Sequence, residues 1–455
     1  MKRNISKILA LSIGFVVIAT LPACTKNDTT TEIAGNNDSP SLDNSGEKIK
    51  LKWYTDTDEI ANETLYKTQE IADVFTEQNP NITIDIQPLV AATNTTSYLQ
   101  KVDLMLASGE QIDVIYFSGG NQASQKIKSN SIIPLNELAE NKGIDLTTEY
   151  TNSLDFNGNY YTLAREDSVY ITFINKDMLD AAGLPIPPLD WNWEDYAEYA
   201  KILTKGDGID KIYGSYFHTW DTMHQMGYFP DTLFFKEDGS SNFDNTSFGD
   251  FLQIRYDMEQ SGISTPFAEI KSQGLAYRDM FFNGKVAMMP QGTWLLGDIK
   301  DIEKYPHKFK TTFASLPRLA DSQTPNATIG SGGSGYSVAA SSEHPQEAFD
   351  LIYFITTWGA DYNKSRISAW SKSDSEGIAK AVMGDDESLY DYEAFQNVMD
   401  SLNQIQLSQF PEYNIEVMQV FTEECELGMT GVQTIDQTIE NLVSRSNEII
   451  DSYKN

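Results

Sequence analysis

Glu166 and Asp167 are the residues that we consider first for catalysis. They follow the turn-rich stretch that includes Tyr161. A glycoside hydrolase needs two carboxyl groups flanking a cleft, one as general acid and one as base or nucleophile. Carboxylates at such a place can instead accept hydrogen bonds from sugar hydroxyls. With 66 acidic residues in the chain, the composition does not decide between these roles.

Two stretches resemble cofactor- or metal-binding motifs but lack the neighbouring residues or elements that such sites need. The stretch "GSGGSG" at 330–335 matches G-x-G-x-x-G, but the strand-like "YSVAAS" follows it where a dinucleotide site needs a helix. The stretch "DGSSNFDN" at 238–245 resembles the start of a calcium loop, yet Phe243 stands where the turn needs glycine, and no glutamate closes the loop. We expect it to be a surface turn. The four histidines show no metal spacing, and no G-x-S-x-G elbow is present. The sequence therefore predicts no metal, no cofactor and no enzymatic activity.

The sequence contains more residues suited to binding a sugar than motifs suited to catalysis. A neutral sugar presents hydroxyl rims and apolar C–H faces, so its site combines aromatic rings with polar side chains. The chain is 11% aromatic. Aromatic side chains at expected loop or strand-end positions are Tyr54, Phe117, Tyr161, Trp220 and Trp294.

The elements that would position these residues alternate between strand and helix. Strands are predicted at 49–54, 81–89 and 112–117, with helices at 64–80 and 97–110 between them. This order is the signature of a doubly wound α/β lobe. Ligands bind beyond the carboxyl ends of parallel strands, where Tyr54, Asp56, Phe117, Ser118 and Asn121 fall.

The first residues have the pattern of an export signal. Basic residues precede an apolar run at 8–20 that is too short for a permanent membrane helix. The following "LPAC", ending at Cys24, resembles the lipobox of bacterial lipoproteins. The resemblance implies cleavage of residues 1–23, a diacylglycerol on the Cys24 thiol and an acylated amine. The polar stretch 24–47 would then be a disordered tether.

The net charge and the length of the chain bear on its partners and on its domain organisation. The net charge is -33, without a basic stripe, so a nucleic-acid partner is not expected. Once Cys24 carries lipid, Cys425 is the remaining thiol and no disulfide within the chain can form. The folded part, about 400 residues, exceeds what one core usually organises and suggests two lobes.

Six stretches occur in the order found in one known family. They are "FTEQNPNITIDI", "YLQKVDLMLASGEQIDVIYFSGG", "IIPLNELAENKGID", "FNGNYYTLAREDSVYITFINKDMLDAAGLPIPPLDWNWEDYAEYAKILT", "NGKVAMMPQGTW" and "GYSVAASSEHPQEAFDLIYFI". The chain resembles the extracellular solute-binding proteins of ABC importers, in particular their carbohydrate-binding group, which includes the maltose-binding proteins.

The resemblance implies a type II periplasmic-binding-protein fold, with two doubly wound α/β lobes and a ligand cleft between them. Transferred to this chain, the plan assigns residues 48–158 and 314–357 to the first lobe. Residues 159–313 and 358–455 would form the second.

The function implied is capture of a sugar or oligosaccharide by a monomer held by lipid at the outer face of the cell membrane, and delivery to the permease of an ABC importer. Another small polar solute, a role in presenting a ligand to a membrane sensor and a secreted glycosidase remain alternatives.

The family also gives Trp294 a role. Its tryptophan in an "AM…G.W" turn stacks on a sugar ring, and "AMMPQGTW" keeps this spacing, with Gly292 expected to allow a sharp backbone turn. A buried structural tryptophan is the alternative. Trp191 and Trp193 are expected to pack at a helix that starts near Asn192 and Asp195. The remaining candidate ligand-binding residues are Tyr161, Glu166, Trp220, Arg366 and Trp370.

Overall fold

The computed structural model describes residues 48–55, 63–89, 95–151, 155–156, 158–227, 234–319, 323–329, 334–405, 411 and 413–454. The export signal, Cys24, the tether and Asp56 lie outside these residues. Glu47–Asn455 form one compact unit. In the part that is described, no helix combines the length and apolar character needed to cross a membrane.

The first sheet has five strands in the order β2-β1-β3-β12-β6. Strands β1 (Ile49–Thr55), β2 (Ile82–Pro88) and β3 (Val114–Phe117) are parallel, as predicted. Strand β12 (Gly335–Val338) is antiparallel to both β3 and β6 (Leu163–Ala164), so the sheet is mixed at this side.

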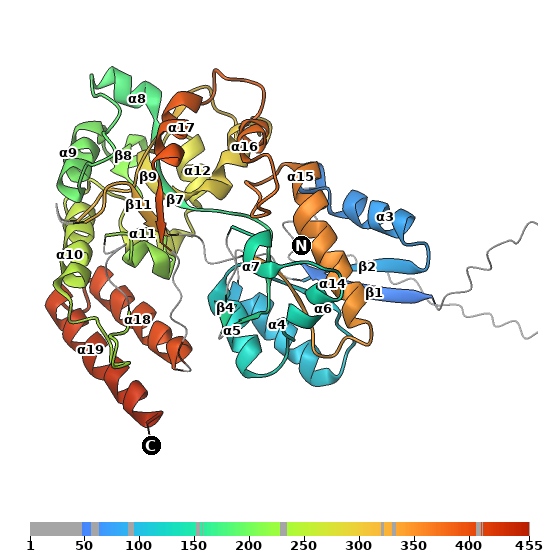
Figure 1. Ribbon diagram of the computed structural model, residues 1–455. Coiled ribbons are helices and arrows are strands. Elements are labelled where there is room, and N and C mark those ends of the chain that lie inside the picture. The colour runs from blue at the N-terminus through green and yellow to red at the C-terminus, as the bar shows by residue number, and fades with distance from the viewer. Residues whose placement is uncertain are drawn as a thin grey trace, which may run out of the picture. The chain divides into compact units, whose positions relative to one another are not determined.

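Helices cover both faces of this sheet. Helices α3 (Thr68–Gln78) and α14 (Pro345–Phe354) pack on the face that carries Leu51 and Trp53. Helices α4 (Thr95–Ser108) and α5 (Gly120–Lys128) pack on the opposite face. Figure 1 shows α14, from late in the chain, beside the first strands. The alternation of strand side chains between two apolar clusters makes this lobe doubly wound.

The second sheet has the order β10-β7-β9-β8. It consists of β7 (Tyr170–Asn175), β8 (Tyr213–Ser215), β9 (Val286–Gly292) and β10 (Thr311–Ala314). Strands β8 and β9 are parallel, whereas β7 is antiparallel to β9 and β10. Ala287 and Met288 of the "AMMPQGTW" stretch lie in β9.

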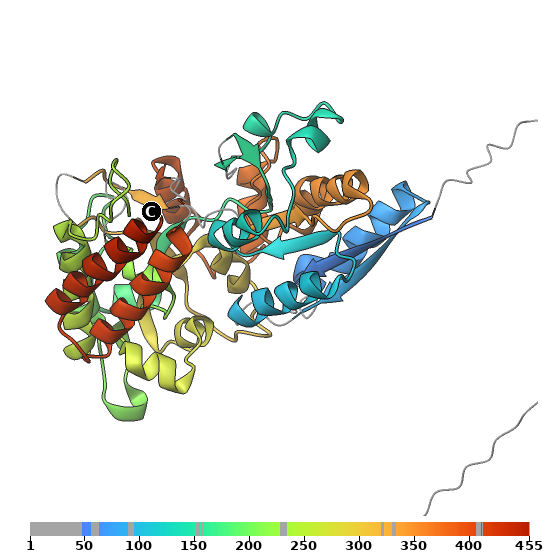
Figure 2. The ribbon, with the colours of Figure 1, turned by 90° about the horizontal axis from the view of Figure 1, so that it is seen from below.

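Two helical layers cover the second sheet. One contains α9 (Trp193–Leu203), α10 (Thr246–Gln260), α18 (Asn414–Met429) and α19 (Ile435–Ser452). The other contains α12 (Tyr277–Phe282), α13 (Leu296–Ile299), α16 (Ser375–Met383) and α17 (Tyr392–Asp400). Helices α18 and α19 lie side by side in both views (Figures 1 and 2).

The remaining elements are short. They are α2 (Glu63–Tyr66), α6 (Asn136–Glu140), α7 (Leu146–Glu149), β4 (Asp155–Phe156), β5 (Asn159–Tyr160), α8 (Lys176–Ala181), η2 (Gly208–Asp210), η3 (Asp221–His224), α11 (Phe267–Gln273), η4 (Thr293–Leu295), β11 (Ala327–Ile329), the π-helical turn η5 (Ile355–Gly359), α15 (Ala360–Asn363) and β13 (Asn403–Ile405).

Local sequence signals explain several boundaries. Asn192 caps α9 and forms a capping box with Asp195, and Trp191 and Trp193 are buried, which confirms both predictions. The single helix predicted at 64–80 is wrong. The chain forms α2 and α3, because Lys67 between them adopts a left-handed conformation with φ 50°.

Segment 165–169 connects the two sheets, leaving β6 at Ala164 and entering β7 at Tyr170. It runs beside segment 366–369, with an antiparallel bridge between Glu166 and Ser368. The lobe boundaries at 158, 313 and 357 stay a proposal. Strand β6, which follows the proposed boundary at 158, pairs within the first sheet. Ile355, which precedes the proposed boundary at 357, packs in the core of the same lobe.

Candidate functional site

The topology brings particular strand ends of both sheets to segment 165–169. In the first sheet, Gly335 at the start of β12 pairs with Phe117 at the end of β3 and with Ala164. In the second sheet, Gly292 at the end of β9 pairs with Tyr170. Carboxyl ends of parallel strands are the usual ligand edge of an α/β sheet. We therefore take the residues around this segment as the candidate site.

A buried ionic cluster occupies segment 165–169. Glu166, Arg165 and Arg366 are each 5–8% exposed. The Glu166 carboxylate lies 3.6 Å from Nη2 of Arg165 and 3.2 Å from Nε of Arg366. It also accepts hydrogen bonds from the hydroxyls of Ser334 at 2.5 Å and Ser168 at 3.0 Å. The cluster therefore joins the start of β12, segment 165–169 and segment 366–369.

These partners set the protonation state of Glu166. Burial by itself raises the pKa of a carboxyl group, but both arginines and the hydroxyls of Ser334 and Ser168 lower it by more. The pKa of Glu166 consequently lies below its usual value. Glu166 is therefore an ionised acceptor at neutral pH and is unsuited to act as a general acid, which needs a raised pKa.

Tyr66 extends the cluster to helix α2. Its hydroxyl accepts a hydrogen bond from Nη2 of Arg366 at 2.5 Å, and the Arg366 guanidinium lies 5.2 Å from the centre of its ring. The Arg165 guanidinium lies 4.8 Å from the ring of Tyr116, whose hydroxyl it also contacts at 3.2 Å. Planar guanidinium groups thus lie against aromatic rings, an arrangement that suits burial of arginine.

An aromatic cluster lies beside the ionic one. Trp294 is partly exposed and meets Tyr170 edge-on at 5.2 Å and Trp220 at 5.9 Å. Trp220, also partly exposed, contacts Tyr277 at 5.3 Å and His218 at 4.5 Å. These residues come from the segments that follow β8 and β9, from the start of β7 and from helix α12. Together they form a partly exposed aromatic surface of the kind that packs against a sugar face.

Gly292 serves this cluster in a different way from the one predicted. Its φ of -78° and ψ of 152° are open to any residue, so no special turn requires glycine here. Glycine is needed here because any larger residue would collide with Trp294: a Cβ atom at Gly292 would lie 2.0 Å from Cζ3 of the indole ring. The indole ring therefore lies directly against the Gly292 backbone.

Other predicted residues lie apart from these clusters. Tyr54 and Phe117 are 1% and 0% exposed and belong to the apolar cluster under α4 and α5. Burial and the hydrogen bond to Glu110 raise the pKa of Tyr54. Trp370 donates its indole N–H to Glu149 at 2.8 Å and packs on the first lobe's core.

Of the remaining predicted residues, Ser118 and Tyr161 belong to neither the ionic nor the aromatic cluster. Ser118 is exposed and exchanges hydrogen bonds with Gln122. Asn121 belongs to α5, and its side chain is outside the described set. Tyr161 is partly exposed and meets Phe156 edge-on at 6.1 Å. Of the predicted side chains, the structure thus brings together Glu166 with Arg366 and Trp220 with Trp294.

Several residues of the two clusters were not predicted: Tyr66, Arg165, Ser168, Tyr170, His218, Tyr277 and Ser334. Arg165 and Ser168 flank Glu166 in the sequence, which is a usable signal. Tyr66 and Tyr277 lie in helical segments and carry no such signal.

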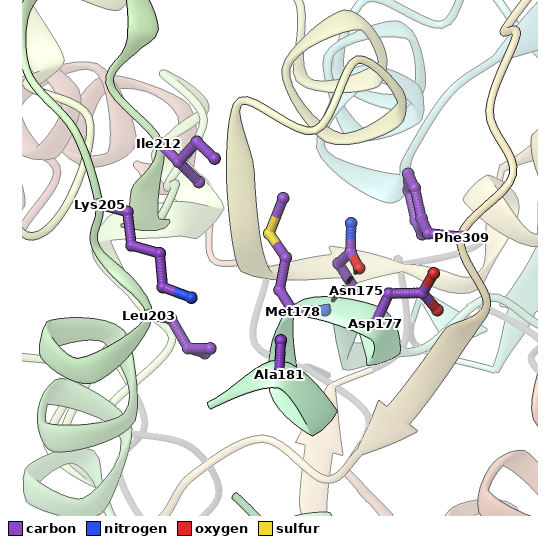
Figure 3. Close-up of a pocket in the computed structure, with 8 residues that line it drawn as sticks. All are labelled: Asn175, Asp177, Met178, Ala181, Leu203, Lys205, Ile212 and Phe309. Carbon is purple, nitrogen blue, oxygen red and sulfur yellow. Dashed lines mark hydrogen bonds between the residues drawn. The ribbon is translucent and has the colours of Figure 1, made fainter. Parts of the chain in front are cut away.

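A separate pocket of about 250 Å³ lies at the other end of the second sheet (Figure 3). Strand β7 begins at Tyr170 near the aromatic cluster and ends at Asn175, which lines this pocket with Met178, Lys205 and Phe309. The pocket is therefore distinct from the candidate site.

Comparison with known proteins identifies the family. The profile of bacterial extracellular solute-binding proteins matches residues 60–360, more than half of the chain. An arabinooligosaccharide-binding protein of Halalkalibacterium halodurans is 23% identical over 296 residues, and the match spans 61% of this chain and 63% of that relative.

Solved structures share the fold. An ABC substrate-binding protein from Listeria monocytogenes, in complex with cycloalternan, is 20% identical, with a TM-score of 0.72 over 89% of this chain and 100% of its own. The sugar-binding protein MalE from Xanthomonas citri is 18% identical, with a TM-score of 0.65 over 89% and 98%. The fold is the type II periplasmic-binding-protein fold with two doubly wound α/β lobes, as predicted. The chain belongs to the family of bacterial extracellular solute-binding proteins.

Proposed function

We propose that this protein captures a sugar or oligosaccharide between its lobes and delivers it to the permease of an ABC importer. The observation that carries the proposal is the partly exposed pair Trp294 and Trp220, in the segments that follow β9 and β8. It lies beside the crossing segment that holds Glu166, Arg165 and Arg366. Aromatic faces next to fixed charged and hydroxyl groups fit the two kinds of surface on a sugar.

The relatives support a carbohydrate as the ligand. Their names and complexes include arabinooligosaccharide, cycloalternan, mannobiose, mannotriose, maltose and α-D-tagatose. Since the match to the arabinooligosaccharide-binding relative spans 63% of that protein, its ligand and partners are proposals for this chain. The diversity of these sugars is reason to test a panel rather than one compound.

A thermal-shift panel tests the proposal. The purified protein is melted with maltose, mannobiose, mannotriose, arabinotriose, cycloalternan and tagatose. A sugar at one hundred times its dissociation constant adds about 2.7 kcal/mol of stability and raises the melting temperature by several degrees. Calorimetry is expected to give one sugar per monomer. A protein whose melting temperature responds to none of these sugars would contradict a carbohydrate ligand of these kinds.

We propose binding without turnover. Glu166 is adjacent to Asp167, but its carboxylate is buried against Arg165 and Arg366, whereas Asp167 is partly exposed and accepts a hydrogen bond from Thr151. The bound sugar is therefore expected to be recovered unchanged after hours of incubation, as chromatography of the mixture would show. Shorter sugars that disappear with Glu166→Gln would instead indicate a glycosidase.

We also propose that Cys24 carries lipid and holds the protein at the outer face of the cell membrane. The full chain expressed in a bacterial host is expected to incorporate a labelled palmitate analogue and to fractionate with membranes. Cys24→Ala removes the only thiol of the lipobox and is expected to abolish the label. Cys425→Ser, which alters a buried thiol, is the control and should keep it. A Cys24→Ala protein that is still lipid-labelled would exclude this anchor.

A further inference from the structure

His218 lies at the border of the aromatic cluster, shortly after the end of β8. Its ring meets Trp220 edge-on at 4.5 Å and lies 5.3 Å from the ring of Tyr277. The side chain is partly exposed. An imidazole at this place stands beside the rings on which a sugar would pack, within the same strand-end edge as Trp294.

The hydrogen bonds of Tyr216 fix the tautomer of His218. The Tyr216 hydroxyl lies 2.8 Å from the carbonyl oxygen of Leu275 and 2.7 Å from Nδ1 of His218. A carbonyl oxygen only accepts, so the single hydroxyl proton of Tyr216 is donated to Leu275. Nδ1 of His218 must then donate to the hydroxyl oxygen. In a neutral imidazole this leaves Nε2 with a lone pair.

The surroundings keep the ring neutral. Burial lowers the pKa of His218 to about 4, and the positive charges of Arg255 and Arg278 act in the same direction. Arg278 itself pairs with Asp298 at 2.7 Å. Across the neutral pH range His218 therefore presents Nε2 as an acceptor, and within the described residues no hydrogen bond to this atom occurs.

We propose that His218 is a specificity-determining residue of the site, whose Nε2 accepts a hydrogen bond from a hydroxyl of a sugar packed on Trp220 and Trp294. The inference rests on the proposed function and names one contact within it. A ring packed on an aromatic face directs its hydroxyls toward the border of that face, where His218 lies. A fixed acceptor there selects for a hydroxyl, since an analogue without that proton leaves Nε2 unpaired.

The test compares a substitution that removes the acceptor, a substitution that can restore it and a matched control. His218→Phe keeps a flat ring but removes the acceptor, whereas His218→Gln can return an acceptor through its amide oxygen. The matched control is His307→Phe. His307 also donates through Nδ1, to the carbonyl oxygen of Tyr305 at 2.7 Å, and packs between Phe282 and Phe309. It precedes β10 at the end of the sheet away from Tyr170.

Calorimetry with each sugar of the panel that binds the wild type is expected to show a loss of affinity of about 10- to 100-fold for His218→Phe. His218→Gln should recover part of this loss, and His307→Phe should bind as the wild type does. Thermal melts of all variants confirm that they are folded. A long-range ¹H–¹⁵N spectrum should show Nδ1 protonated in the free protein, and the His218 Nε2 resonance should shift when sugar is added.

The outcomes separate this inference from the proposed function. If no sugar of the panel binds the wild type, the proposed function and this inference both fail. If sugar binds the wild type and His218→Phe with equal affinity, and the Nε2 resonance does not move, this inference alone is wrong. An unprotonated Nδ1 in the free protein overturns it as well.

Discussion

Trp294→Ala is expected to weaken sugar binding by about 2 to 4 kcal/mol, which is roughly 30- to 1,000-fold in the dissociation constant. The ring is partly exposed and would lose a large desolvated contact with the ligand. Its packing on Tyr170 and Trp220 predicts a smaller loss of folding stability, about 1 kcal/mol. Calorimetric titration and a denaturant melt of the same variant measure the two effects.

Trp358→Ala is the matched control. Trp358 is partly exposed too, but it packs against the apolar cluster of the first sheet. It stacks between Phe354 and Tyr362, with ring centres 4.8 Å and 4.6 Å away. Its removal should leave sugar affinity unchanged. The quenching or shift of tryptophan emission on sugar binding should persist in Trp358→Phe and largely vanish in Trp294→Phe.

Gly292→Ala gives a second test of the same ring. The added Cβ would lie 2.0 Å from Trp294, so the indole must move without any change in its chemistry. We expect sugar affinity to fall by at least tenfold, or about 1.4 kcal/mol. Unchanged affinity in Trp294→Ala, together with a stability loss of about 3 to 5 kcal/mol, would instead identify Trp294 as a structural core residue.

The parts of this fold that the sequence predicts are those with local signals. The alternation of apolar residues in 49–54 and the apolar run at 112–117 predict β1 and β3, and Asn192 with Asp195 predicts the start of α9. Lys67 illustrates the limit, since its left-handed conformation divides a helical pattern that is otherwise continuous. Lysine has no intrinsic preference that would reveal such a break.

The candidate site is less accessible to sequence analysis because its contacts are non-local. Glu166 and Arg366 are 200 positions apart in the sequence and meet because segments 165–169 and 366–369 run side by side. Strand ends are predictable, but the face on which a residue lies decides its environment: Tyr54 and Phe117 lie under α4 and α5. The acceptor role of His218 depends on a carbonyl group at Leu275, which no motif encodes.

Glu259→Gln is expected to lower the free energy of unfolding by about 3 to 5 kcal/mol. Arg255 and Glu259 lie in α10 with side chains 0% and 1% exposed, joined by a contact of 2.9 Å between Nε and Oε1. Removing the carboxylate charge leaves the buried guanidinium without an ion partner among the residues that the structure describes. It still contacts the neutral His224, whose Nδ1 lies 3.2 Å from Nη1 of Arg255. Urea denaturation followed by circular dichroism measures the loss.

Two further variants distinguish the cost of an unpaired buried charge from the cost of altered packing. Glu198→Gln removes a carboxylate from the exposed pair with Lys201, 3.8 Å apart, and should change stability by less than about 0.5 kcal/mol. The double substitution Arg255→Met with Glu259→Leu removes both charges and should recover most of the stability lost in Glu259→Gln. A double variant as unstable as the single one would place the energy in packing rather than charge.

Arg255, which forms a network with Glu259 and His224, also contacts the segment that carries the proposed sugar-binding residues. The Arg255 guanidinium lies 5.2 Å from the ring of Phe217, the residue before His218, and contacts His224 at the end of η3. It therefore anchors both ends of segment 217–224, which carries His218 and Trp220. If this anchoring positions them, Glu259→Gln should weaken sugar binding even below the denaturant range in which the protein unfolds. If the double substitution Arg255→Met with Glu259→Leu binds sugar more tightly than Glu259→Gln does, it has restored the position of Phe217. Equal sugar affinity in the wild type and in folded Glu259→Gln would restrict the network to stability alone.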